Sequence, residues 1–446
     1  MAQVQLLGLP AEVIDAICRA LCLHCMDNPI PPPSYGWHPY HSGDLYAISS
    51  ALSCLSQTCS TLRAYAQPIL YHYPRPFTHG DLSLVRTLVT RPDLAKWVKR
   101  LDLGQRTVSV EGQPLSAEDI PVYEASMAEC RGQDGKPVRV SRNWSTDDFR
   151  KLVDGPRFQF NPTAALSALV VTRVPNVQHL CVELDYGWEF PFCQPGSLPH
   201  LTELTIRDRN MRSGTKASQA EGILAAAPNL IVFNGFMVVN CSRSVSNGSV
   251  IEVNLKRSAL DSTSLSRLMH GFKKLQSFSY EAGDVSISRG REETPRELFD
   301  ALRIRADSLQ HISLAFDDSE LFGHLKPGGL ITSFKEMHQL KSLSISAGAI
   351  YRKMEEADNE SIDDGTLLVE ILPSSIQSLT IHYPTVFMFK AIVQLIITAH
   401  SRFPSLEEVR LPSLGNIDME HFRMARYGTK VNVYSTVRER YCVRDG

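Results

Sequence analysis

Residues 9–21 read LPAEVIDAICRAL, and residues 51–71 read ALSCLSQTCSTLRAYAQPILY. Apolar residues recur at helical spacing in both stretches, which predicts short amphipathic helices. Pro10 suits a first helical turn, where its missing N–H costs nothing, and Pro68 is expected to end the last helix. Because helices this short cannot bury so much apolar surface against one another, we expect part of it to contact another surface.

Beyond these helices, one phrase of the form Leu-x-x-Leu-x-Leu recurs along the chain. Its first copy is Val98–Leu103 and its last is Leu406–Leu411, with ten copies if the weak one around Phe233 is included. The phrase is the strand part of a leucine-rich repeat, and amphipathic helical segments separate the later copies. From the second copy onward, whose central residue is Leu180, the copies are 20–29 residues apart at first and 30–36 residues apart later, so the repeats are irregular.

Alternation along each strand predicts which residues lie on the open face of the sheet. Residues between the second and third apolar positions point away from the helices, because successive strand side chains face opposite sides. Most of them are small and polar, which suits a protein or peptide ligand better than a phosphate backbone. The predicted target-binding residues are Asp102, Cys181, Thr205, Asn254, Ser279, Ser313, Ser344, Thr380 and Arg410. Asparagine is not regularly placed after the strands, so we expect apolar packing alone to hold the array together.

The two quoted stretches resemble an F-box, specifically that of fungal proteins that also carry leucine-rich repeats. The pattern is an opening L-P-x-E, an apolar pair, a C-x-x-L-R segment and a closing P-x-L-Y, and all four parts are present. The segment from about His24 to Asp44 is longer than the family's usual connection between helices. The resemblance covers nearly the whole chain, with the most specific motifs in the first 71 residues.

The resemblance implies a substrate receptor of a Skp–Cullin–F-box ubiquitin ligase. Its partners would be the small adaptor subunit, a cullin reached through that adaptor, and a target protein of unknown identity. The chain itself would be no enzyme. The residues expected to bind the adaptor are Leu9, Pro10, Val13, Ile14, Ile17, Leu55, Cys59 and Leu62. The alternative is a repeat scaffold outside any ligase, with the same helices reduced to a cap on the array.

The expected fold class is α/β, with a helical F-box followed by an irregular leucine-rich-repeat solenoid. Its parallel sheet would curve, with helices on the convex side. The F-box would occupy residues 1–75, with a proline-rich insertion between its helices, and a tail would occupy 436–446. The solenoid would occupy 76–435, with insertions at 104–162, 281–293 and 352–365. Ser145 is expected to cap a helix in the first insertion.

Composition excludes several function classes. The net charge of −2 over 446 residues lacks the basic excess of nucleic-acid binders and does not favour a membrane partner. No signal peptide and no membrane span are recognised, so the ten cysteines are interpreted as reduced thiols of a cytoplasmic or nuclear protein. Phosphate-binding loops, zinc-protease motifs and nucleophile elbows are absent from the sequence, so no catalytic residue and no cofactor are assigned.

One spacing leaves a metal site open. Cys22, Cys25, His38 and His41 form C-x2-C-x12-H-x2-H, close to a zinc-finger spacing. The second half fits poorly, because Pro39 lies between the histidines and prevents a regular helical turn. A helix end followed by an exposed loop is the simpler interpretation, and no metal is assigned.

Overall fold

A computed structural model describes two compact units. It describes residues 6–26, 43–74, 82–103, 116–130, 139–141, 144–145, 162–184, 190, 192–208, 214–243, 245–283, 294–316, 327–351, 365–385, 388–412 and 431–434. The first unit is formed by residues 1–210 and 219–230, and the second by 211–218 and 231–446. The domain boundary expected at residue 75 lies inside the first unit.

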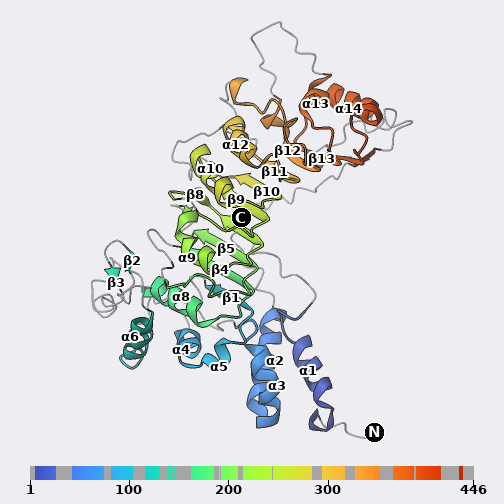
Figure 1. The fold of residues 1–446 in the computed structure, drawn as a ribbon. Coiled ribbons are helices and arrows are strands. Elements are labelled where there is room, and N and C mark those ends of the chain that lie inside the picture. The colour runs from blue at the N-terminus through green and yellow to red at the C-terminus, as the bar shows by residue number, and fades with distance from the viewer. Residues whose placement is uncertain are drawn as a thin grey trace, which may run out of the picture. The chain divides into compact units, whose positions relative to one another are not determined.

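The first unit begins with helices and continues into a short parallel sheet (Figure 1). In its sheet, β4 lies between β1 and β5. Its helices are η1 (Leu6–Gly8), α1 (Ala11–Ala20), α2 (Gly43–Thr58), α3 (Ser60–Leu70), α4 (Leu82–Thr90), α5 (Pro92–Ala95), α6 (Asp119–Glu129), α8 (Pro162–Arg173) and α9 (Glu221–Ala226). Its strands are β1 (Arg100–Leu103), β2 (Arg139–Ser141), β3 (Trp144–Ser145), β4 (His179–Leu184) and β5 (Glu203–Asp208).

The second unit is a longer parallel sheet in the order β7-β9-β10-β11-β12-β13-β14-β15, with α10 and α12 on the same side of its first strands (Figure 1). Its main strands are β7 (Val232–Phe236), β9 (Glu252–Ser258), β10 (Ser277–Ala282), β11 (His311–Ala315), β12 (Ser342–Ser346), β13 (Ser378–His382), β14 (Glu408–Arg410) and β15 (Asn432–Tyr434). Its helices are α10 (Ser262–Gly271), α12 (Pro295–Leu302), α13 (Leu367–Ile371) and α14 (Phe389–Arg402). The short elements are β6 (Thr215–Lys216), β8 (Val238–Asn240), η5 (Arg303–Arg305), η6 (Pro327–Gly329) and η7 (Ala347–Ala349), while η4 (Ala217–Ala220) spans the junction of the units.

Every predicted strand phrase forms a strand, including the weak copy around Phe233. The apolar residues of each phrase are buried; Leu101, Phe233 and Val253, for example, are fully buried. Neighbouring copies pair in parallel with the predicted positions opposite one another, as with Ser313 and Ser344. The mixed α/β class with a long parallel sheet is therefore confirmed, and β15 is an additional strand that the repeat pattern did not predict.

The helices between strands also follow the apolar pattern. The helix α12 has the capping box expected from the sequence, in which Thr294 and Glu297 each accept a hydrogen bond from the other's backbone N–H. Leu298, Phe299 and Leu302 of this helix are buried. None of the helices in the described ranges combines the length and apolarity that a membrane crossing needs.

Three local expectations are wrong. The helix α3 continues through Pro68 to Leu70, because a proline so near the end removes only one of the helix's N–H donors. Ser145 lies in strand β3 rather than at a helix cap. Apolar packing is not the only link between repeats, because Asn176 and Asn229 donate side-chain hydrogen bonds to carbonyls of the preceding repeat, each at 2.8 Å.

Candidate functional site

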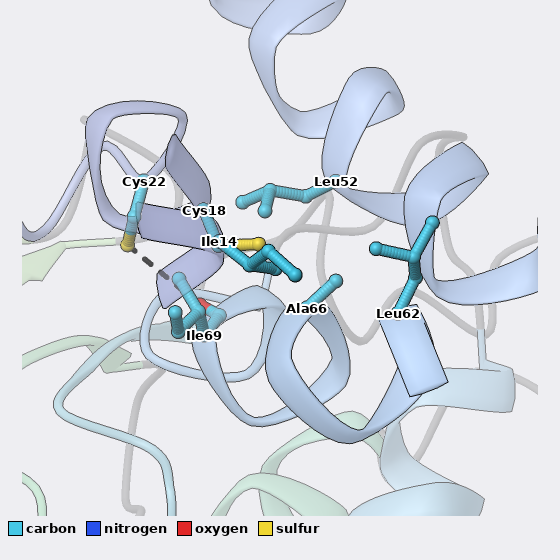
Figure 2. Packing of buried hydrophobic residues seen from close by; sticks show 7 residues of the cluster. All are labelled: Ile14, Cys18, Cys22, Leu52, Leu62, Ala66 and Ile69. Carbon is cyan, nitrogen blue, oxygen red and sulfur yellow. Dashed lines mark hydrogen bonds between the residues drawn. The ribbon is translucent and has the colours of Figure 1, made fainter. Parts of the chain in front are cut away.

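The first three helices share one small apolar core (Figure 2). The helix α1 contributes its inward stripe, α2 a leucine, and α3 three residues one turn apart. The amphipathic pattern of each helix therefore has its partner within the same unit. The buried members are Ile14, Cys18, Cys22, Leu52, Leu62, Ala66 and Ile69.

Two residues expected to bind an adaptor belong to this core instead. Ile14 and Leu62 are each only 4% exposed, so the neighbouring helices cover their side chains. The physical reason is the position of each on its helix: both lie on the stripe that faces the other two helices. They stabilise the helical unit, and a partner cannot reach them without opening it.

The other six expected residues keep some accessible surface. Leu9, Leu55 and Cys59 are half-buried and pack against the core. The Cys59 sulfur also caps α3 by accepting the backbone N–H of Leu62 at 3.5 Å. Pro10 and Val13 are exposed, and Ile17 is half-buried one turn further along α1.

Two exposed leucines that the motif did not include precede α1. Leu6 is 36% exposed, Leu7 is 58% exposed, and Val13 on the first turn of α1 is 41% exposed. Together with the exposed Pro10 we call these residues the N-terminal apolar face: Leu6, Leu7, Pro10 and Val13. The opening of α1 therefore presents apolar side chains although the helices already bury a core of their own.

Two cysteines and two histidines converge where α1 and α3 end. Their ligand atoms lie within 4.8 Å of one another, and we call this set the Cys–His cluster: Cys22, His24, Cys25 and His72. The Cys25 sulfur is 3.3 Å from His72 Nδ1 and 3.6 Å from His24 Nδ1. The Cys22 sulfur is 4.0 Å from the same His72 nitrogen.

Burial disfavours the charged forms of three members of the cluster, Cys25, His72 and His24. It raises the pKa of the Cys25 thiol to about 11 and lowers the pKa of His72 to about 4. The pKa of His24 is also lowered, again mainly by burial. Cys22 is 3% exposed and His72 is 7% exposed, so both are buried, while the exposed loop expected after this helix end lies outside the described residues.

Sequence spacing identified only half of this cluster. His38 and His41, the other members of the zinc-like spacing, lie outside the described residues. His24 sits inside the Cys22-Leu-His-Cys25 turn and could have been considered a ligand. His72 lies 47 residues after Cys25, and only the packing of α3 against α1 brings it there.

The predicted open face of the second unit is one continuous row. Asn254, Ser279, Ser313, Ser344 and Thr380 occupy matching positions on successive strands, followed by Arg410. All except the exposed Arg410 are half-buried, as expected for side chains beside others on a sheet face. Apart from Arg410, the side chains of the row are small and polar.

In the first unit one residue of the predicted row is buried. Asp102, Cys181 and Thr205 are in register, but Cys181 is buried and its thiol pKa is raised to about 12 by that burial. On β4 it lies between His179 and Glu183, and each of these pairs with a residue of β5: His179 with Glu203 at 3.0 Å, and Glu183 with Arg207 at 2.7 Å. Asp102 accepts a hydrogen bond from the Tyr73 hydroxyl. Of these three residues only Cys181 is buried, whereas Asp102 and Thr205 are half-buried like the row of the second unit.

Comparisons with known proteins identify no family. No family model and no curated protein matches the chain. A solved structure, the crystal structure of a TLR13–ssRNA13 complex, is similar at 12% sequence identity with a TM-score of 0.29. The match covers 61% of this chain and 35% of that one, so this chain spans about a third of that protein's length. A likeness of this size carries no argument about function.

Proposed function

We propose that this chain is a substrate receptor of a Skp–Cullin–F-box ubiquitin ligase, in which the first helices bind the adaptor and the sheet of the second unit binds a target. The observation that carries the proposal is the N-terminal apolar face. Leu7 and Val13 are 58% and 41% exposed, and neither belongs to the core that the first three helices share. Such apolar side chains at a helix opening suit a protein partner.

The target would bind the polar row of the second unit. Its central residues are serine, threonine and asparagine, which donate and accept hydrogen bonds without a fixed charge. The charged residue at the end of the row is already paired, since Arg410 donates to Glu408 at 2.9 Å. A protein or peptide ligand fits this chemistry better than a polyanion.

The chain would act by proximity. Holding a target near a ubiquitin-charged enzyme makes the transfer effectively intramolecular, so the receptor needs no catalytic residue. This function therefore requires two binding surfaces, one in each unit.

Co-purification with the ligase adaptor tests the proposal. Leu7→Asp and Val13→Asp place charges on the N-terminal apolar face without touching the core, and we expect each to weaken adaptor binding at least about tenfold. Ile397→Asp is the matched control, because Ile397 is also 48% exposed on a helix but lies in the second unit. Failure of the wild type to bind adaptor, or equal loss in the control, would contradict the proposal.

The second candidate function is a repeat scaffold outside any ligase, in which the first helices cap the array. One observation favours it. Backbone N–H groups of Lys99 and Arg100 donate to the carbonyl of His72 at 2.9 and 2.8 Å, so the segment after α3 is bonded directly to the first strand. A cap is expected to be needed for solubility. Removing residues 1–75 should then cause aggregation, and a soluble, monomeric truncation would exclude this function.

A further inference from the structure

We propose that Cys22, His24, Cys25 and His72 bind one zinc ion. The four ligand atoms lie within 4.8 Å of one another. Thiolate and imidazole are the ligands that zinc takes in structural sites, and two of each give a common set. This site is separate from the proposed ligase role, which uses the opposite end of α1.

The distances match a tetrahedral site closely. Zinc–sulfur bonds of about 2.3 Å and zinc–nitrogen bonds of about 2.0–2.1 Å place tetrahedral ligand atoms about 3.4–3.8 Å apart. The observed sulfur–nitrogen separations are 3.3, 3.6 and 4.0 Å. These three pairs are within about 0.4 Å of tetrahedral distances, and the remaining pairs lie within 4.8 Å, so shifts of at most about 1 Å would close the set around an ion. The two histidine rings lie edge to face, with centroids 5.4 Å apart.

Backbone hydrogen bonds hold both cysteines in one turn. After α1 ends, the N–H groups of Cys25 and Met26 donate to the Cys22 carbonyl at 2.9 and 3.0 Å, which closes a tight turn. This turn brings both sulfurs near His72, two residues after the end of α3. Both cysteines are free thiols, so no disulfide competes for the sulfurs.

The surroundings of His24 are those of a metal ligand. Its Nδ1 points toward the Cys25 sulfur, and its Nε2 is 3.4 Å from the side-chain oxygen of Gln178. Ligand histidines usually donate their second ring N–H to an oxygen in this way, which fixes the ring and its tautomer. Gln178 immediately precedes β4, so the ion would tie the ends of α1 and α3 to the first sheet.

Charge and burial fit the same ligand set. Two thiolates balance the charge of Zn²⁺, and a neutral site suits a position where Cys22 and His72 are buried and the other two ligands half-buried. The site would hold together helices that otherwise share only a small core. We therefore expect the ion to have a structural role.

Metal analysis of the purified full chain, expressed with zinc, tests the site. We expect one zinc per chain, and tetrahedral cobalt–thiolate absorption after exchange for Co²⁺. The double variant Cys22→Ser/Cys25→Ser and the variant His72→Gln should lose the metal. Cys54→Ser and His270→Gln should keep it, since both side chains are exposed and lie elsewhere.

Two further variants keep the result interpretable if a variant fails to fold. His72→Cys replaces one zinc ligand by another and should retain the ion where His72→Gln does not. His38→Gln/His41→Gln tests the ligand set suggested by spacing and should leave the zinc content unchanged. Wild-type protein without stoichiometric zinc would overturn the proposal. Loss of metal from the His38/His41 variant, with retention in His72→Gln, would overturn it too.

Discussion

Replacing Ile14 with alanine should open the first three helices, whereas the same change one residue earlier should not. Ile14 is 4% exposed and packs into the shared core of α1, α2 and α3. Truncating a fully buried isoleucine to alanine costs about 2–5 kcal/mol, through lost burial and the cavity left behind. We expect about 3 kcal/mol for Ile14, because the small core around it has few ways to close.

Amide hydrogen exchange of peptides covering α1 and α3 measures this loss directly, as the free energy of local opening. A loss of about 3 kcal/mol corresponds to an increase in exchange rate of about a hundredfold. Val13→Ala is the control, since Val13 is 41% exposed and surface changes usually stay within about 0.5 kcal/mol. The argument that separates core from surface on α1 would be refuted by equal effects of the two substitutions.

Three further predictions concern the second unit. Thr294→Ala removes the side-chain cap of α12 and should cost about 1 kcal/mol in urea unfolding followed by circular dichroism. Gly271→Ala should cost about 1–3 kcal/mol in the same assay, because an added Cβ would overlap a neighbouring backbone carbonyl, while Gly248→Ala has open space and should be neutral. The hydrogen bond from Ser378 is the main cause that lowers the pKa of Glu408, so Ser378→Ala should raise that pKa in an NMR titration. Because the pKa of Glu408 is lower in the folded than in the unfolded chain, the ionised Glu408 stabilises the fold above its unfolded pKa of about 4.3, and this stabilisation is lost as the pH falls through the folded pKa. An unchanged Glu408 titration in Ser378→Ala would contradict the assignment.

The sheet could be predicted from the sequence because its pattern has a period of two. A strand that buries Leu343 and Ile345 must place Ser344 on the other face, whatever the rest of the chain does. Parallel stacking then sets the register from strand to strand, which is why the predicted row of polar residues is confirmed position by position. Cys181 is buried although it lies on the predicted face, so the alternation along a strand does not by itself determine exposure.

The helices were less predictable because helical spacing leaves a choice of face. Val13 and Ile14 are adjacent and both apolar, and either could face a partner on the spacing alone. Which of them is buried depends on where α2 and α3 pack, and that is a property of the tertiary structure. The same limit applies to His72, whose approach to Cys22 depends on the contact between α1 and α3.

The helix α1 separates the two proposed sites. Val13 lies on its first turn and Cys22 follows its last, and a ten-residue helix is about 15 Å long. An adaptor on the N-terminal apolar face would therefore not touch a zinc ion in the Cys–His cluster. Zinc would instead act through the stiffness of α1, because it fixes the far end of the helix against α3. It follows that His72→Gln should speed amide exchange at the end of α1 more than at its start, and should leave Val13 in place for a partner. An adaptor-binding defect in His72→Gln as large as that of Val13→Asp would show that the two sites are not separate.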